Sequence, residues 1–271
     1  TLGRTLVGLV PSTAGEIWFE GKQLSTSNGF RSKHVHREMQ IIFQDPFGSL
    51  DPRMRVRDAV AEGLAIHGIG DRRRRREVVD GILARVGLRP EAANHFPHEF
   101  SGGQRQRIGI ARALVVEPKF VVADEPVSAL DVSIQSQVLN LLVELKREFH
   151  LTYLFVAHNL AVVGYISDRI AVMYLGKIVE LSPARELFAH PQHPYTMALI
   201  SAIPQPVPKQ AGDRIILTGD VPSPVNPPSG CRFRTRCPIA QPICAEVEPP
   251  LASKRDEHLA ACHFAGTPIR T

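Results

Sequence analysis

Long apolar runs are missing from this sequence. No stretch approaches the roughly 18 to 20 consecutive apolar residues that cross a bilayer, and no charged segment followed by an apolar one opens the chain as a secretory leader would. We therefore expect a soluble protein whose contact with any membrane is made through a partner. The 271 residues, 44% of them hydrophobic, suffice for one large domain with an appendage.

A concentrated basic surface is also missing. The net charge of +5 is compatible with a nucleic-acid partner, but the basic residues are scattered among 27 acidic ones. The one dense run is 72–76, five consecutive arginines in a helical segment. We interpret it as a solvated helix face, and a contact with lipid headgroups or a partner protein is the alternative.

The start of the sequence indicates a chain that begins inside a fold. It opens on Thr1 rather than Met, and 1–9 follows a helical pattern with leucines on one face. We therefore expect a fragment of a longer protein. Further along, 16–19 and 40–43 are predicted to be strands, and 56–86 is predicted to form a helical insert.

Helices and strands alternate after Ser101, which predicts an α/β fold with a mainly parallel sheet covered on both faces. Ligands of such a sheet bind at the carboxyl ends of its strands. The predicted elements are helix 105–114, strand 120–123, helix 134–149, and strands 153–156 and 170–174.

The composition changes near residue 201, where proline becomes frequent and all four cysteines follow. We predict a main domain over 1–200, with a helical subdomain at about 45–115, and a separate extension over 201–271.

Two carboxylates stand where the apolar strand 120–123 emerges. Asp124 at this point can hold Mg²⁺, and Glu125 can polarise an attacking water, as phosphate hydrolysis requires. An acidic strand end that caps a helix is the alternative.

A glycine pair stands directly before the helix 105–114. In the sequence Ser101-Gly102-Gly103-Gln104, the glycines let backbone N–H groups approach an anion, and the start of the helix adds partial positive charge. This pattern is typical of a phosphate-binding site, although the same residues also occur in ordinary turns.

Taken together, these motifs resemble those of the ABC ATPases. The motifs are SGGQRQR at 101–107, VADEP at 122–126, SALD at 128–131, and His158 after the strand 153–156. The resemblance implies an ABC-type P-loop NTPase that binds ATP and Mg²⁺.

The resemblance also implies roles for single residues. Asp124 matches the Walker B aspartate that holds Mg²⁺, and Glu125 matches the catalytic base. Gln44 matches the glutamine that senses Mg²⁺ and couples to the membrane subunit, and His158 matches the switch histidine that contacts the γ-phosphate.

Other motif residues would act across a dimer. In this family Ser101, Gly102, Gly103 and Gln104 contact the ATP held by the opposite subunit, and Asp131 lies in a loop that communicates between the two sites. The glycine-rich loop with its lysine is expected just ahead of Thr1. Taken literally, the chain as printed should bind ATP poorly and hydrolyse little.

Further motifs resemble the ATPase subunits of oligopeptide and dipeptide importers, and more closely the second of the two unlike subunits. These motifs are IFQDP at 42–46, SLDPR at 49–53, FPHEF at 96–100, HPYT at 193–196, NPPSGC at 226–231 and RCP at 236–238. The implied partners are a second ATPase subunit, two membrane permeases and, indirectly, an extracytoplasmic peptide-binding protein. The implied location is the cytoplasmic face of the membrane.

Competing interpretations remain open from the sequence. The cargo could be nickel or another small solute in place of peptide. The chain could also be a truncated product that does not hydrolyse ATP. A soluble ABC ATPase acting on nucleic acid or ribosomes is disfavoured, because such proteins usually have two cassettes or a long coiled-coil insert.

The cysteines Cys231, Cys237, Cys244 and Cys262 are wider apart than the usual zinc pairs and differ from the ferredoxin run. Related importers imply that they can carry a [4Fe–4S] cluster. Zinc binding and plain reduced thiols are the alternatives, and His263 is a further candidate ligand. Disulfides are disfavoured in a cytosolic ATPase.

Overall fold

The computed structural model describes residues 1–24, 32–204, 214–255 and 257–269, and divides into two compact units. The first unit is Thr1–His158 and the second is Asn159–Thr271. Each unit is described by itself below. The predicted division of the chain near residue 200 stays a prediction.

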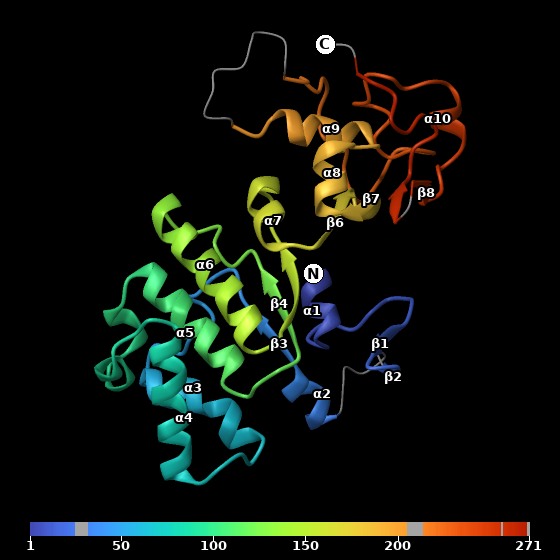
Figure 1. The fold of residues 1–271 in the computed structure, drawn as a ribbon. Helices are drawn as coiled ribbons and strands as arrows, with labels where there is room; N and C mark the ends of the chain where they lie inside the picture. Colours follow the sequence, from blue (N-terminus) through green and yellow to red (C-terminus); the bar gives the residue numbers. More distant parts are fainter. Residues whose placement is uncertain (25–31, 205–213, 256, 270–271) are drawn as a thin grey trace. The chain divides into compact units, whose positions relative to one another are not determined.

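A three-stranded parallel sheet organises the first unit, in the order β3, β4, β5 (Figure 1). The central strand has no exposed residue in its middle, since Val121, Val122 and Ala123 are all fully buried. Burial on both faces explains its continuous apolar run. The strands are β3 (Met39–Ile42), β4 (Phe120–Asp124) and β5 (Thr152–Val156).

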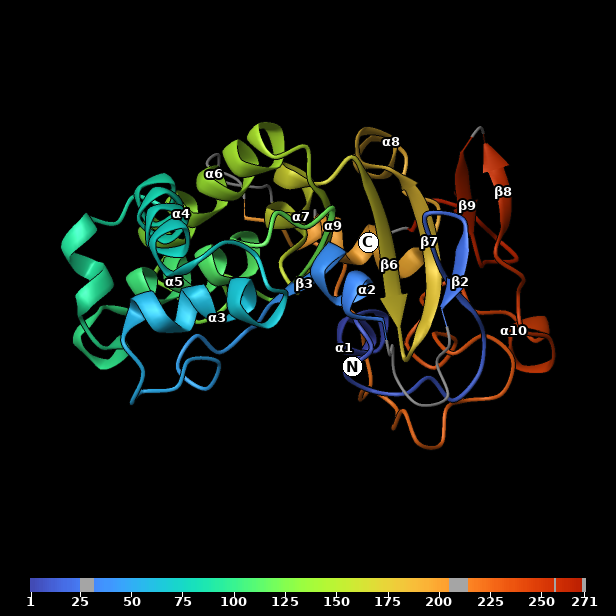
Figure 2. The ribbon, with the colours of Figure 1, turned by 90° about the horizontal axis from the view of Figure 1, so that it is seen from below.

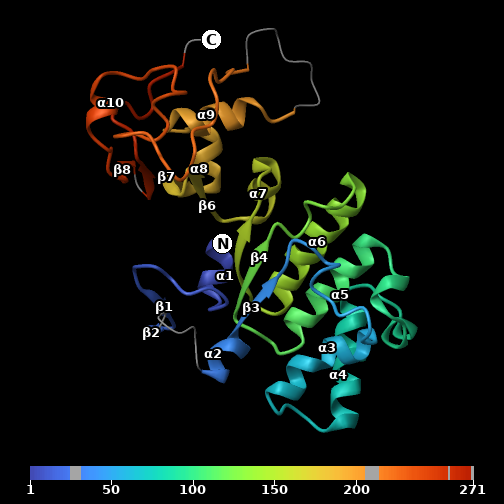
Figure 3. The same cartoon turned by 180° about the vertical axis from the view of Figure 1, so that it is seen from behind.

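Helices cover both faces of this sheet, as the sequence predicts. The short helix α1 (Leu2–Leu6) lies on one side of β3 and β4, and α5 (Gly102–Leu114) and α6 (Val132–Glu148) lie on the other (Figures 1 and 3). Helix α6 connects β4 to β5, as a parallel pair of strands requires.

The segment before β3 forms a small hairpin and a helix. Strands β1 (Ile17–Phe19) and β2 (Lys22–Leu24) pair antiparallel, and α2 (Lys33–Glu38) leads into β3. Apolar side chains of both hairpin strands pack on a buried cluster of Val7, Met39 and Val122.

The helical insert consists of two helices and two short 3-10 turns, which gather beside α5 (Figure 2). Arg73 is 89% exposed and pairs with Glu77, so the arginine run lies on an exposed helix face; whether that face meets only solvent stays a prediction. Asp71 caps the helix by accepting a hydrogen bond from the Arg74 N–H. The elements are α3 (Val56–Ile66), α4 (Arg72–Arg85), η1 (Pro90–Asn94) and η2 (Pro97–Glu99).

The second unit contains a four-stranded antiparallel sheet in the order β6, β7, β9, β8 (Figure 2). Here the sequence prediction needs a correction, because the strand predicted at 170–174 pairs antiparallel with β7 and does not continue the parallel series. The two residues between the strands, Leu175 and Gly176, both have positive φ, which makes a tight hairpin turn. The strands are β6 (Arg169–Tyr174), β7 (Lys177–Pro183), β8 (Ala252–Arg255) and β9 (His258–Ala260).

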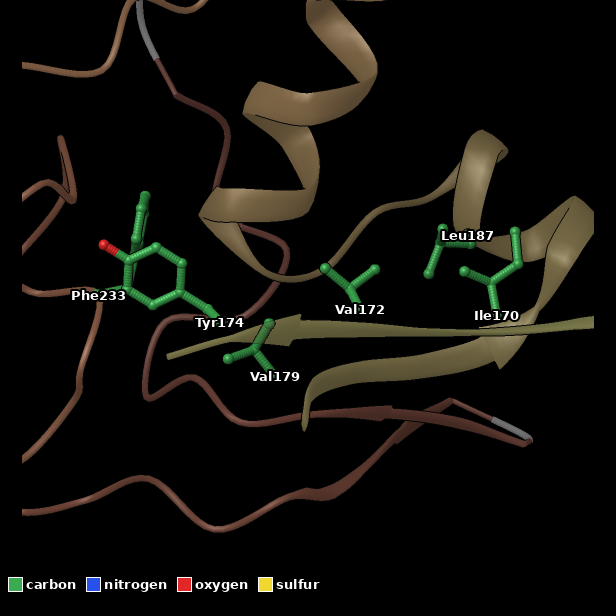
Figure 4. Close-up of a cluster of buried hydrophobic side chains, with 6 residues drawn as sticks. All are labelled: Ile170, Val172, Tyr174, Val179, Leu187 and Phe233. Carbon is green, nitrogen blue, oxygen red and sulfur yellow. The ribbon is translucent and has the colours of Figure 1, made fainter. Parts of the chain in front are cut away.

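Alternation along β6 builds the core of this unit. Ile170, Val172 and Tyr174 are buried and the residues between them are exposed. Figure 4 shows these side chains on one side of the strand, with Val179, Leu187 and Phe233 completing the cluster. The helices are α7 (Leu160–Ile166), α8 (Ala184–Ala189), α9 (Pro194–Ser201) and α10 (Ile243–Glu246).

A buried carboxylate ties three segments of the second unit together. Glu180 on β7 is fully buried and accepts hydrogen bonds from the backbone N–H groups of Gln192 and His193, at 2.7 and 2.8 Å. His258 Nε2, also fully buried, lies 2.7 Å from Glu180 Oε1. Removing one side chain of such a pair leaves the other buried without its hydrogen-bond partner, which destabilises the fold.

We predict that Glu180→Gln lowers the free energy of unfolding of the second unit by about 3–5 kcal/mol, because its amide cannot accept all three hydrogen bonds. Denaturant unfolding of the full-length protein measures this. The matched control is Glu248→Gln, which removes an ion pair with Lys177 whose side chains are about half exposed. The control substitution should lower the free energy of unfolding by about 1 kcal/mol or less. Equal losses in both variants would contradict the structural role of Glu180.

Candidate active site

The carboxyl ends of β3, β4 and β5 bring together side chains that are far apart in the sequence. Gln44 follows β3, Asp124 ends β4 and is followed by Glu125, and His158 follows β5. Since the strands are parallel and in register, with Ile42 opposite Ala123, these ends meet at one edge of the sheet.

Glu125 occupies an unusual backbone conformation. Its φ of 47° lies in the left-handed region, which costs a residue other than glycine about 1–3 kcal/mol. Its N–H donates a 2.9 Å hydrogen bond to the carbonyl of Val156, the last residue of β5. Strained residues of this kind cluster at functional sites, and here the strain falls on the predicted catalytic base.

Two side chains converge on one oxygen of this carboxylate. Gln44 Nε2 donates to Glu125 Oε2 at 2.9 Å, and His158 Nδ1 lies 3.4 Å from the same oxygen. The His158 side chain is 70% exposed and that of Glu125 is 29% exposed. The structure thus places three of the residues predicted from the sequence in direct contact, at a partly open site.

Asp124 lies beside the N-terminal helix. A Cβ atom built on Gly3 of α1 would come within 2.7 Å of Val122 Cγ1 and 3.9 Å of Asp124 Oδ2, so only glycine permits this approach. Gly3 is a site residue that the sequence analysis missed, and the available signal was a glycine inside a helical pattern.

The oxygen atoms at this edge suit Mg²⁺. Carboxylate and amide oxygens are hard ligands, and Mg²⁺ takes only one or two carboxylates, with water and substrate phosphates in the remaining positions. Among the described residues there is no group of three or more His, Cys, Asp or Glu side chains arranged to hold a metal ion. Asp124 with the neighbouring Glu125 and Gln44 fits the smaller protein contribution that Mg²⁺ needs.

The glycine motif begins helix α5 with a reciprocal cap. Ser101 Oγ accepts from the Gln104 N–H at 3.3 Å, and Gln104 Oε1 accepts from the Ser101 N–H at 3.0 Å. A Cβ on Gly103 would come within 2.4 Å of Ile134 Cγ2 on α6, whereas one on Gly102 would find ordinary contact distances. Gly103 is therefore also required for the packing of α5 against α6.

Asp131 precedes α6 and is exposed. Its carbonyl accepts from the Gln135 N–H at 2.8 Å, but its carboxylate makes no capping hydrogen bond. Among the described contacts none joins Asp131 or the glycine motif to the carboxylate of Glu125.

The four cysteines line one small cavity in the second unit, together with His193 and His263. None of them forms a disulfide. Burial raises the pKa of the Cys231 and Cys262 thiols and raises that of Cys237 to about 11, so the thiols are protonated in the metal-free protein. The cavity holds about 10 Å³, the space of a single water, and the cysteines do not form a ready-made metal site among the described residues.

Comparisons with known proteins agree with these motifs. Residues 1–128 match the ABC transporter family, and 179–244 match the oligopeptide/dipeptide transporter C-terminal region. The oligopeptide transport ATP-binding protein AppF of Bacillus subtilis is 52% identical, over 97% of this chain and 81% of AppF. The chain belongs to the ATP-binding proteins of ABC transporters. This ABC ATPase therefore belongs to a family that uses ATP and Mg²⁺ and hydrolyses ATP to power transport.

Other relatives of this ABC ATPase extend the comparison. The oligopeptide transport ATP-binding protein OppF of Haemophilus influenzae is 50% identical, over 97% of this chain and 80% of OppF. The solved structure of cbiO1 from Clostridium perfringens, part of the ABC transporter complex cbiONQ, superposes with a TM-score of 0.61. That match has 30% identity and covers 69% of this chain and 73% of cbiO1. The predicted family and fold class are confirmed.

Proposed function

We propose that this chain is the ATP-hydrolysing subunit of an importer for peptides. The observation that carries the proposal is the convergence of Gln44 and His158 on the strained Glu125. Support for peptide cargo comes from the match of 179–244 to the oligopeptide/dipeptide region and from the relatives AppF and OppF.

In the proposed reaction Glu125 orients the attacking water and takes up its proton. Gln44 fixes the carboxylate by donating to Oε2. His158, whose Nδ1 is 3.4 Å from the same oxygen, would bridge this carboxylate to the terminal phosphate of bound ATP. Asp124 would hold Mg²⁺, which when bound would neutralise charge on the phosphate oxygens.

The proposed working unit is a dimer of ATPase subunits. Ser101, Gly102, Gly103 and Gln104 would face the ATP bound by a second ATPase subunit, with Asp131 linking the two sites. The closed dimer would bind ATP more tightly than the open dimer, and this difference in affinity would drive transport. The pair would dock on two permeases at the cytoplasmic face of the membrane, and a binding protein would deliver the peptide. Among the helices of the described residues there is no candidate for a membrane-spanning segment.

We further propose that the extension over 201–271 holds a [4Fe–4S] cluster. Support comes from four soft thiolate donors, Cys231, Cys237, Cys244 and Cys262, that line one cavity although the first and the last are 31 positions apart. When bound, the cluster would supply a redox-active or purely structural crosslink. The alternatives are bound zinc and plain reduced thiols, and the metal analysis described below distinguishes both from the cluster.

We predict that Glu125→Gln in the full-length subunit leaves ATP binding intact and slows turnover by several orders of magnitude, because the amide cannot accept the proton of water. ATP turnover of the purified importer and uptake of a labelled peptide by cells measure this. The control is Glu117→Gln, an exposed carboxylate of the same unit. Full turnover in Glu125→Gln would overturn the catalytic role, and uptake of nickel in place of peptide would overturn the cargo.

We predict about four iron and four acid-labile sulfide atoms per chain after anaerobic purification. Cys244→Ser removes one buried donor and should lower both contents. A serine at an exposed position away from the cavity, Tyr165→Ser, is the control. Zinc without sulfide, or neither metal, would contradict the cluster.

A further inference from the structure

Helix α5 carries two arginines that contact the loop containing Gln44. Arg105 and Arg112 are seven residues apart, about two helical turns, so both side chains project from the same face. The helix begins at the glycine motif and packs on β3, which directly precedes the loop 43–49. A single rigid element therefore connects the motif proposed to face the partner's ATP to the loop that reaches Glu125.

Arg105 is held tightly although it is charged. It is 8% exposed, and its guanidinium donates to the carbonyls of Pro97 and His98 at 2.7 and 3.1 Å. The group also stacks 3.5 Å from the centroid of the Phe47 ring, which is 63% exposed. Its Nη1 is buried and has no hydrogen-bond partner among the described residues.

Arg112 contacts the other end of the same loop. Its Nη1 donates to the carbonyl of Ser49, and its guanidinium lies 6.0 Å from the centroid of the Phe43 ring. Burial lowers the pKa of Arg112, with a nearby carboxylate, Glu62, acting in the opposite direction. The side chain thus meets the loop on both sides of Gln44.

The loop is braced internally as well. Asp45 Oδ1 accepts from the Phe47 N–H at 2.8 Å, and Ser49 Oγ donates to the Pro46 carbonyl at 3.3 Å. A Cβ on Gly48 would come within 2.8 Å of the Asp45 carboxylate, so the turn is closely packed. The loop is therefore braced internally and is also held to α5 by the contacts of Arg105 and Arg112.

We propose that Arg105 and Arg112 are positioning residues that fasten the loop 43–49 to α5 and thereby set the hydrogen bond between Gln44 and Glu125. A shift of the glycine motif, or of the exposed Phe47 under a partner, then changes the position of the catalytic carboxylate. This inference rests on the proposed function of Glu125.

Stability alone does not explain these arginines. Arg105 has a buried guanidinium with an unpaired nitrogen, and an apolar side chain of similar size would fill the same space at a lower desolvation cost. The stack of Arg105 on the largely exposed Phe47 ring adds little stability, because the ring side of the contact is open to water. A role in coupling gives a reason for keeping a planar, charged group at both positions.

The test uses the full-length subunit assembled with its permeases, and compares ATP turnover with and without peptide-loaded binding protein. Phe47→Leu and Arg112→Lys should each lower this stimulation ratio about fivefold or more, in the range of typical couplings. Arg85→Lys is the matched control, since Arg85 stacks 5.2 Å from the Phe149 ring away from the loop. Its ratio should stay unchanged.

A Gln44→Ala background separates coupling from a merely structural effect. If the arginines act through Gln44, Arg112→Lys should cause no further loss of stimulation in that background. An unchanged ratio in Phe47→Leu, an equal loss in Arg85→Lys, or an additional loss in the Gln44→Ala background would overturn the proposal. Because Phe47 is exposed, Phe47→Leu should fold normally, and its stimulation ratio tests the proposal even if an arginine variant fails to fold. Full turnover in Glu125→Gln would instead overturn the proposed function.

Discussion

The hydrogen bond from the Glu125 N–H to the Val156 carbonyl is the interaction on which the rest of the site depends. It holds Glu125 in a left-handed conformation at the point where β4 ends, next to the end of β5. Because β3, β4 and β5 run parallel, the same edge also receives Gln44 and His158. A three-stranded parallel sheet with a buried central strand thus brings separate sequence motifs into one cluster around a single carboxylate oxygen.

Much of this could be predicted from the sequence. The apolar run that ends in Asp124-Glu125 predicts a buried parallel strand with acids at its carboxyl end, because such strands are covered on both faces. The helical periodicity of the insert and of α6 is strong, and both predictions hold in the structure. The order of the motifs was enough to identify the family.

Features that depend on contacts between distant residues could not be predicted. The strand Arg169–Tyr174 has the same local pattern as a parallel strand, and only the positive φ values at Leu175 and Gly176 turn it into an antiparallel hairpin. The need for glycine at Gly103 arises from Ile134 on another helix. The buried pair of Glu180 and His258 joins residues 78 positions apart, and no local rule places a histidine opposite that carboxylate.

A double-mutant cycle in ATP turnover tests the central claim, that Gln44 acts by positioning the Glu125 carboxylate. The full-length importer is compared as wild type, Gln44→Ala, Glu125→Gln and the double variant. We expect the double variant to be nearly as active as Glu125→Gln alone, within about threefold, because residues that act as a unit are strongly non-additive. Losses that multiply in the double variant would show that Gln44 acts independently of Glu125 and would contradict this view of the site.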